Sequence, residues 1–154
     1  MAKPKVLFLC TGNSSRSQMA EGFLRSIAGA AFEALSAGTD PTPVNPLAVQ
    51  VMREKGVDIS RQVSKSVGVF LGQHVPYVIT VCDKANERCP IFPGVVRRLH
   101  WSLENPAGAT GSSEERLAVF RRVRDEIEAH VARFVEEVAG GKPLTGDAAR
   151  YRPA

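Results

Sequence analysis

The first apolar run of this sequence, at residues 6–9, leads through a short loop of small and polar residues into a helical pattern at residues 18–28. The loop, residues 10–17, reads Cys-Thr-Gly-Asn-Ser-Ser-Arg-Ser. A strand that turns directly into a helix brings several backbone N–H groups together at the helix N-terminus, where they can bind an anion. The start of the chain therefore predicts a βα unit with an anion site at the carboxyl end of its strand.

Strand-like and helical patterns continue to alternate after this unit. Three further segments are candidate strands, at residues 32–36, 77–81 and 97–101. Asn45 and Pro46 supply an N-cap and a first helical residue for a helix at 47–55. Ser112 or Ser113 begins a long helix with a continuous apolar stripe. Since such alternation forms right-handed βαβ units, the predicted fold is an α/β three-layer sandwich, with a central four-stranded parallel sheet and helices on both faces.

The chain has the size of one domain, and we expect residues 1–139 to form it. Residues 140–154 are rich in glycine and lack a periodic apolar pattern, so we expect a flexible C-terminal tail there. The sequence shows neither a signal-peptide pattern nor an apolar run long enough to span a membrane. These features predict a cytoplasmic protein without a membrane partner.

The net charge of +4 favours an anionic ligand. Nucleic acid is the other common partner of a basic protein. The basic residues are spread along the sequence, however, and aromatic residues make up only 6% of it. The densest basic stretch, at 116–124, is interleaved with glutamate and apolar residues, as on the solvated face of a helix. We therefore predict no nucleic-acid binding.

Cys10 and Arg16 give the loop a nucleophile and a partner for an oxyanion. A guanidinium presents a planar fork that matches two oxygens of a tetrahedral oxyanion. Cys10, beside that positive charge, is expected to be a thiolate, which is the nucleophilic form of cysteine. The predicted oxyanion-binding residues are Thr11, Gly12, Asn13, Ser14, Ser15 and Arg16. The alternative is a buried packing cysteine with an arginine in solvent; the loop composition and the strand-to-helix context favour the catalytic interpretation.

Two more cysteines follow the strand predicted at 77–81. Cys82 comes directly after it, and the ends of the first and third strands can be neighbours in a parallel sheet, so Cys82 can approach Cys10. Cys89 lies in the polar segment that follows. This arrangement supplies a nucleophile and two resolving thiols for disulfide exchange. The alternatives are inert buried thiols or metal ligands, but the wide spacing lacks the close pairs of a zinc site, so we predict no metal.

Together these residues resemble the thioredoxin-coupled arsenate reductases, which share the fold of the low-molecular-weight tyrosine phosphatases. The resemblance covers about residues 4–137. The shared motifs lie at residues 10–22, 36–38, 44–46, 58–60, 81–83, 89–90, 100–101, 105–108 and 120–127. The loop motif is common to the whole superfamily, whereas the cysteine pair at 82 and 89 distinguishes the reductases from the plain phosphatases.

The resemblance implies a mechanism without a cofactor. Cys10 attacks the arsenic of arsenate, which is held by the loop amides and Arg16, while Ser17 hydrogen-bonds the Cys10 thiolate. Cys82 then attacks the Cys10 sulfur, the electron pair passes to arsenic, and arsenite leaves. Cys89 attacks Cys82 in turn, and thioredoxin or another dithiol reductant reduces the resulting disulfide.

The sequence departs from the family pattern at two positions. Asn105, preceded by Glu104, stands where the family has the aspartate that acts as general acid, which predicts weak phosphatase activity. Family members that bind potassium near the loop use Asn13, Glu21, Ser36 and an acidic residue at the position of Lys65. The ammonium group of Lys65 is expected to take the place of the ion, so we predict no potassium site.

Two other functions remain open from the sequence. A low-molecular-weight tyrosine phosphatase would also use Cys10 and Arg16, but it needs a working acid and an aromatic groove beside the loop. Trp101 alone lies on a segment expected to border the site. A non-catalytic oxyanion-binding module would not need two resolving cysteines.

Overall fold

The computed structural model describes residues 3–139; the tail predicted at 140–154 lies outside them. The strands are β1 (Lys5–Cys10), β2 (Glu33–Gly38), β3 (Tyr77–Thr80) and β4 (Arg97–His100). The α-helices are α1 (Arg16–Ala28), α2 (Pro46–Arg53), α3 (Asp83–Glu87) and α4 (Ser113–Ala139). Two short 3-10 helices are η1 (Val67–Phe70) and η2 (Pro106–Gly108).

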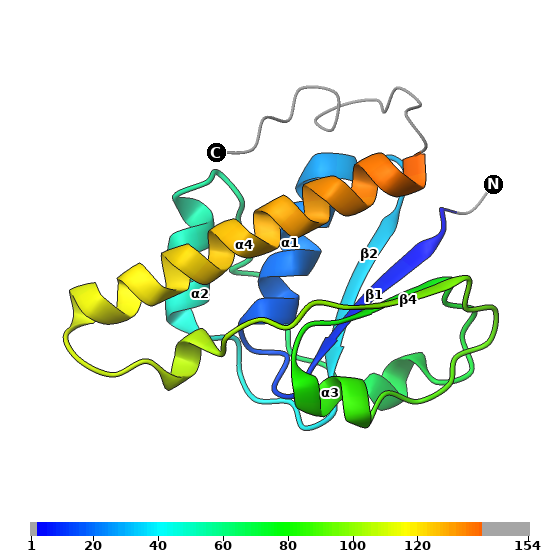
Figure 1. Cartoon of the computed structure of the whole chain (residues 1–154), viewed down its shortest axis with the longest axis horizontal. Coiled ribbons are helices and arrows are strands. Elements are labelled where there is room, and N and C mark those ends of the chain that lie inside the picture. Colours follow the sequence, from blue (N-terminus) through cyan, green and yellow to red (C-terminus); the bar gives the residue numbers. More distant parts are fainter. Residues whose placement is uncertain (1–2, 140–154) are drawn as a thin grey trace.

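The four strands form one parallel sheet in the order β2-β1-β3-β4. Helices α1 and α4 cover one face of the sheet with α2 beside them, whereas α3 and η1 lie on the opposite side (Figure 1). The α/β architecture predicted from the sequence is therefore confirmed. Because β1 and β3 are adjacent, the segments that follow Cys10 and Thr80 meet at the same edge of the sheet, where ligands bind in open α/β folds.

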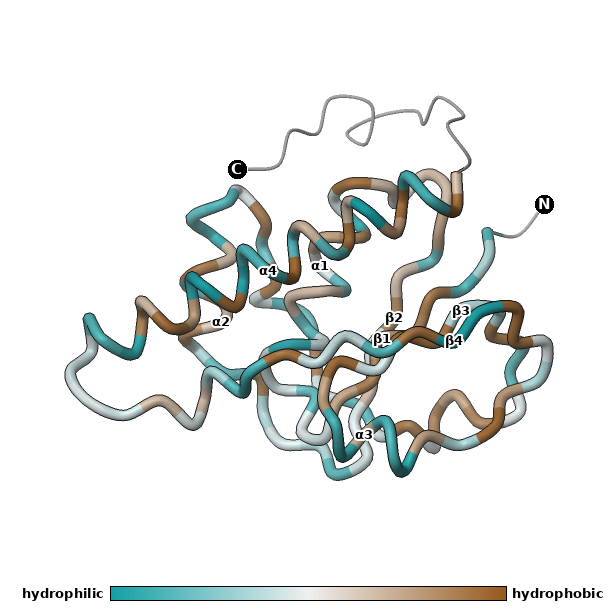
Figure 2. Tube along the Cα trace, viewed as in Figure 1, coloured by the Kyte–Doolittle hydropathy of each residue, from teal (hydrophilic) through white to brown (hydrophobic). Residues whose placement is uncertain are grey.

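The hydrophobic core lies between the sheet and the two long helices. Strand β1 is buried from Val6 to Cys10, and Figure 2 shows hydrophobic residues concentrated along the central strands. Phe23 of α1 and Phe120 and Phe134 of α4 are almost completely buried against them. This core fixes the strands whose carboxyl ends carry the cysteines.

The predicted helix starts are confirmed at two places. The Asn45 side chain accepts a hydrogen bond from the backbone N–H of Leu47 (2.9 Å) and caps α2. Ser112 and Glu115 exchange reciprocal hydrogen bonds between side chain and backbone N–H at the start of α4, the arrangement called a capping box. In the described part of the chain, none of the helices combines the length and apolar composition that crossing a membrane requires.

The structure differs from the prediction at several boundaries. Helix α1 begins at Arg16 rather than residue 18, and β3 and β4 each end one residue earlier than predicted. Helix α3 was not predicted, because its five residues are too few to show an apolar period.

Candidate active site

The loop between β1 and α1 curls around a point beside Cys10. Its carbonyl groups are held from outside: those of Cys10, Thr11 and Gly12 accept hydrogen bonds from the backbone N–H groups of Thr39, Asp40 and Thr42, and that of Ser14 accepts one from Asn45. In a trans peptide the C=O and the next N–H point in opposite directions. The N–H groups of the loop therefore turn inward, which is the arrangement of an anion nest.

Two positions allow this tight path. Asn13 has a φ of +49°, in the left-handed region that asparagine tolerates better than most residues. At Gly38, the last residue of β2, an added Cβ would lie 2.6 Å from the Thr11 carbonyl oxygen. Any side chain at position 38 would therefore push the loop away from the sheet.

Two groups contact the Cys10 sulfur at the base of the loop. The Asn13 backbone N–H donates to Cys10 Sγ at 3.1 Å, and Ser17 Oγ lies 2.8 Å from the same atom. The Lys65 backbone N–H donates to Asn13 Oδ1, so Asn13 Nδ2 is the atom that donates to Ser17 Oγ (2.8 Å). The Ser17 hydroxyl proton is then available to Cys10. Two hydrogen-bonding groups therefore converge on one buried sulfur.

The Arg16 side chain bridges the loop to a distant segment. Its Nη1 donates to the Leu103 carbonyl at 3.0 Å, which fixes one arm of the guanidinium. The charge of Arg16 also reaches Asp83, the residue after Cys82. The His100 side chain, which hydrogen-bonds Asp83, chiefly holds the pKa of that carboxyl below its usual range; Ser102 adds to the effect, and the charge of Arg16 contributes less.

Cys82 lies beside the loop, as the order of the strands requires. Its sulfur is 3.2 Å from Thr11 Oγ1 and accepts a hydrogen bond from the backbone N–H of Ala85 (3.4 Å), so it is the N-cap of α3. The side chain is 5% exposed. The structure thus brings a second thiol to the oxyanion loop.

Cys89 lies at the other end of α3, just beyond the C-cap residue Arg88. It is half-buried, and burial raises the pKa of its thiol, with the charge of Arg98 acting in the opposite direction. Cys82 and Cys89 flank the five residues of α3, which at a rise of 1.5 Å per residue span about 7.5 Å, beyond the Cα separation of about 4.4–6.8 Å that a disulfide allows. A disulfide between them therefore requires α3 to unwind.

The structure does not bring Asn105 into hydrogen-bond contact with Cys10 or Arg16. The Asn105 side chain instead accepts from the backbone N–H of Ala107 at 3.1 Å and caps η2. Glu104 forms an ion pair with Arg122 of α4. The segment still borders the loop, through the contact of Leu103 with Arg16.

Beneath the loop, Lys65 lies beside a buried carboxylate. Glu21 is 4% exposed and accepts hydrogen bonds from Ser36 Oγ (2.7 Å) and Arg25 Nη2 (2.6 Å), while Lys65 Nζ lies 3.8 Å from Glu21 Oε1. Two cationic side chains therefore surround this carboxylate. In the described residues no group of three or more His, Cys, Asp or Glu side chains is placed to hold a metal ion.

The sequence did not indicate the polar residues that support the site. Gln18 donates to the Asn13 carbonyl and side chain, and Gln62 donates to Gln18, so a chain of amides fixes the loop from below. The His100 side chain hydrogen-bonds Asp83, the residue after Cys82. These contacts join segments far apart in sequence and left no local pattern by which they could have been found.

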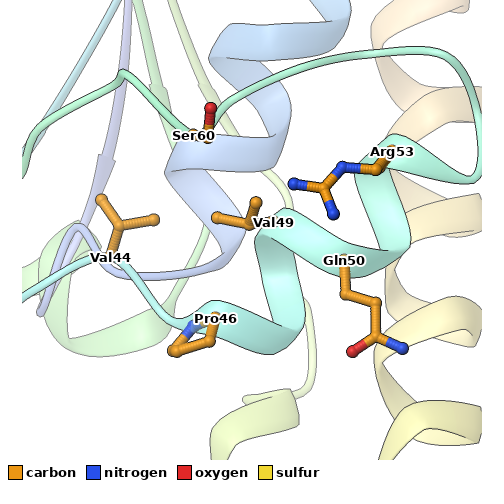
Figure 3. Close-up of a pocket in the computed structure, with 6 residues that line it drawn as sticks. All are labelled: Val44, Pro46, Val49, Gln50, Arg53 and Ser60. Carbon is orange, nitrogen blue, oxygen red and sulfur yellow. The ribbon is translucent and has the colours of Figure 1, made fainter.

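A separate surface pocket of about 470 Å³ lies on α2 (Figure 3). Its lining residues are Val44, Pro46, Val49, Gln50, Arg53 and Ser60. None of the predicted site residues lines it, and it holds no cysteine or carboxylate. This pocket therefore offers none of the predicted catalytic groups.

Comparison with known proteins agrees with this geometry. Residues 5–143 match the family model of low molecular weight phosphotyrosine protein phosphatases. An arsenate reductase of Shouchella clausii is 46% identical over 136 residues, which are 88% of this chain and 98% of that protein. A solved arsenate reductase in the phosphate binding state has a TM-score of 0.72 at 33% identity and covers 88% of this chain and 98% of its own.

A thioredoxin-dependent arsenate reductase of Corynebacterium glutamicum also shares the fold. It has a TM-score of 0.72 at 29% identity, over 91% of this chain and 64% of that one. The match of the family model to almost the whole described chain, with high identity to full-length relatives, establishes the relationship. The chain belongs to the low molecular weight phosphotyrosine protein phosphatase family, in which it has arsenate reductases as near relatives.

Proposed function

We propose that this protein reduces arsenate to arsenite through three thiols and is regenerated by thioredoxin or another dithiol reductant. The observation that carries the proposal is the contact between Cys82 and Thr11 of the oxyanion loop (3.2 Å), which places a second thiol beside the nucleophile. A phosphatase has no use for that thiol. The arsenate reductases among the relatives, one of them thioredoxin-dependent, support the same reaction.

The reaction begins when the Cys10 thiolate attacks arsenic. The inward N–H groups and Arg16 hold the oxyanion, an oxygen leaves as water after it is protonated, and a Cys10–arsenic bond forms. Cys82 then attacks the Cys10 sulfur. The disulfide bond forms as the sulfur–arsenic bond breaks, and its electron pair stays on arsenic, which leaves as arsenite.

Disulfide exchange completes the cycle. The Cys89 thiolate attacks Cys82, the Cys10 thiolate leaves, and the Cys82–Cys89 disulfide takes two electrons from the external dithiol. Free thiols persist in a reducing compartment, so the proposal places the protein in the cytoplasm.

The alternative is a tyrosine phosphatase that uses Cys10 and Arg16. Such a phosphatase needs an aromatic groove beside the loop, and in the described residues Trp101 and Tyr77 do not form one. Trp101 stacks on His130 of α4, with 4.8 Å between the ring centroids, and Tyr77 packs on Phe134 in the core, with 5.5 Å between the ring centroids. We therefore expect phosphatase activity to be weak.

A thiol count tests the proposal. The fully reduced protein, with no other reductant present, is mixed with arsenate, and its free thiols are counted before and after the reaction. We expect a loss of two thiols per arsenite formed, and none with phosphate or in the Cys10→Ser variant. An unchanged thiol count with arsenate would leave only a phosphatase or an oxyanion-binding protein.

A further inference from the structure

Side chains of β4 hold α3 at both of its ends. Arg98 Nη2 donates to the Asn86 carbonyl at 2.7 Å and lies 3.2 Å from Asn86 Oδ1. His100 Nε2 lies 2.9 Å from Asp83 Oδ1, and Ser102 Oγ donates to the same oxygen at 3.3 Å. Alternate residues of a strand lie on one side of it. Arg98 and His100 of β4 therefore act together with Ser102, which follows the strand, and we call the three residues the β4 clamp.

The clamp is tied to the sheet interior at one end. His100 Nδ1 lies 2.7 Å from Oγ1 of Thr80, a fully buried residue of β3 that is also the register partner of His100. The chain of contacts therefore runs from the core through His100 to Asp83, the residue after Cys82. At the other end Arg98 lies near enough to Cys89 for its charge to act on the pKa of that thiol.

Helix α3 has few other contacts to stabilise it. It is five residues long, and only Ala85 among them is buried. A helix of this length is unstable in water by itself. Its stability therefore depends on the Cys82 cap, on the clamp and on the hydrogen bond from Thr80 Oγ1 to Asn86 Oδ1 (3.3 Å).

The contacts of the β4 clamp with α3 are compatible only with the state in which Cys82 and Cys89 are both free thiols. With α3 folded, Cys82 and Cys89 are too far apart for a disulfide, so the helix must unwind when that bond forms. Unwinding moves Asp83 and Asn86 away from His100 and Arg98. The clamp therefore stabilises the dithiol state and not the disulfide state.

We propose that the β4 clamp is a positioning device that holds Cys82 at the oxyanion loop and raises the reduction potential of the Cys82–Cys89 pair. The inference rests on the three-thiol relay proposed above. Each time the disulfide takes two electrons and two protons from an external dithiol, α3 refolds onto the clamp, and the contacts regained favour reduction. The fold thus favours reduction of the Cys82–Cys89 disulfide by the external dithiol.

The reduction potential tests the clamp. The full-length chain carries Cys10→Ser, so that only Cys82 and Cys89 can form a disulfide. It is equilibrated at pH 7 with mixtures of reduced and oxidised dithiothreitol, and the fraction of Cys82 and Cys89 present as free thiols is measured. Arg98→Met and His100→Leu are each expected to shift the equilibrium toward the disulfide by about three- to tenfold, since each removes hydrogen bonds. Tenfold corresponds to about 30 mV for this two-electron couple. Arg98→Lys, which keeps one donor group, should shift it less.

Arg121→Met is the matched control. It removes another hydrogen-bonded arginine, Arg121 of α4, whose hydrogen bonds go to Glu54 at the end of α2. The potential should remain that of the parent. The charge of Arg98 also acts on the Cys89 thiol, and Arg98→Lys keeps that charge while it removes part of the hydrogen bonding. If either clamp variant fails to fold, the other tests the opposite end of α3.

Hydrogen exchange gives a second measurement on the reduced protein. The backbone N–H groups of Asn86 and Arg88, bonded to the carbonyls of Cys82 and Lys84, should exchange faster in both clamp variants than in Arg121→Met. Equal potentials in clamp and control variants would refute the clamp while leaving the relay intact. Failure of the parent to form a Cys82–Cys89 disulfide under any oxidising mixture would refute the relay, and the clamp with it.

Discussion

At the scale of single residues, the hydrogen bonding around Cys10 depends on which way the Asn13 amide points. A backbone N–H can only donate, so the Lys65 N–H fixes Asn13 Oδ1 as its acceptor and Asn13 Nδ2 as the donor to Ser17. The Ser17 hydroxyl then has its proton for Cys10. The orientation of one buried amide thus leaves the Ser17 hydroxyl proton available to the Cys10 sulfur.

Ser17→Ala should reduce the reactivity of Cys10. The substitution removes one of two hydrogen bonds to the sulfur, and such bonds to charged groups contribute about 1.5–3 kcal/mol. We expect alkylation of Cys10 by iodoacetamide at pH 7 to slow by at least about tenfold. Ser14→Ala, in the same loop, serves as the control and should change the rate little. Equal rates in the two variants would mean that Ser17 does not stabilise the thiolate.

Asn105→Asp should raise phosphatase activity selectively. General acid catalysis contributes about 10²–10⁴-fold when the leaving group needs a proton. Hydrolysis of a phosphotyrosine peptide should therefore increase far more than that of an activated aryl phosphate, and arsenate reduction should change modestly. The double variant with Glu104→Gln is the control. If Asn105→Asp has no effect and Glu104→Gln lowers hydrolysis, Glu104 already supplies the proton.

At the scale of elements, the sequence predicted what local patterns can encode. The periodic stripe of α4 and the cap at Asn45 were sufficient to locate those helices. The neighbouring positions of Cys10 and Cys82 followed from strand order. Helix α3 and the Asp83–His100 contact could not be predicted, because they depend on β4, which lies close to α3 only after the sheet forms.

Helix α3 also separates the two resolving thiols, and this gives a test of their roles. Cys89→Ser should allow one turnover of arsenate and then stop, since the Cys10–Cys82 disulfide stays buried beside the loop. Hydrolysis of a small aryl phosphate, which needs only the loop and Cys10, should be unchanged. Repeated turnover of Cys89→Ser with thioredoxin would contradict the three-thiol relay.

The segment that carries Lys65 contacts the oxyanion loop, since the Lys65 backbone N–H donates to Asn13 Oδ1. We predict that the Lys65 ammonium, 3.8 Å from Glu21, takes the place of a bound cation. Catalytic efficiency should then be equal in potassium and in sodium at the same ionic strength. Lys65→Asp should introduce a dependence on potassium. Several-fold activation of the unmodified protein by potassium would show that an ion binds there after all.

At the scale of the whole molecule, a cluster of ion pairs joins the end of α2 to α4. Arg124, whose side chain is 8% exposed, donates to the Val51 carbonyl and to Glu54, and Arg121 binds the same carboxylate. These bonds hold the C-terminal end of α2 against α4. Since Asn45 at the start of α2 also holds the Ser14 carbonyl, this helix connects the cluster to the oxyanion loop.

The cluster should make folding stability depend on pH. The hydrogen bond from Arg121 is the main cause that lowers the pKa of Glu54 to about 2, against the opposing effect of desolvation, and Arg124 adds to it. Because the folded-state pKa lies below the unfolded value, the stabilisation is complete above about pH 4.5 and is lost as the pH falls toward 2. The Glu54 side chain is 35% exposed, so solvent screening limits the contribution to about 1 kcal/mol.

Glu54→Gln should therefore lower the free energy of unfolding at pH 7 by about 1 kcal/mol and have a diminishing effect as the pH approaches 2. Urea unfolding of both proteins at a series of pH values measures the difference. The exposed Glu136 of α4 provides the control, since Glu136→Gln should change stability by less than about 0.5 kcal/mol at any pH. A difference between Glu54→Gln and the parent that stays constant from pH 7 to 2 would show that the carboxylate acts through its shape rather than its charge.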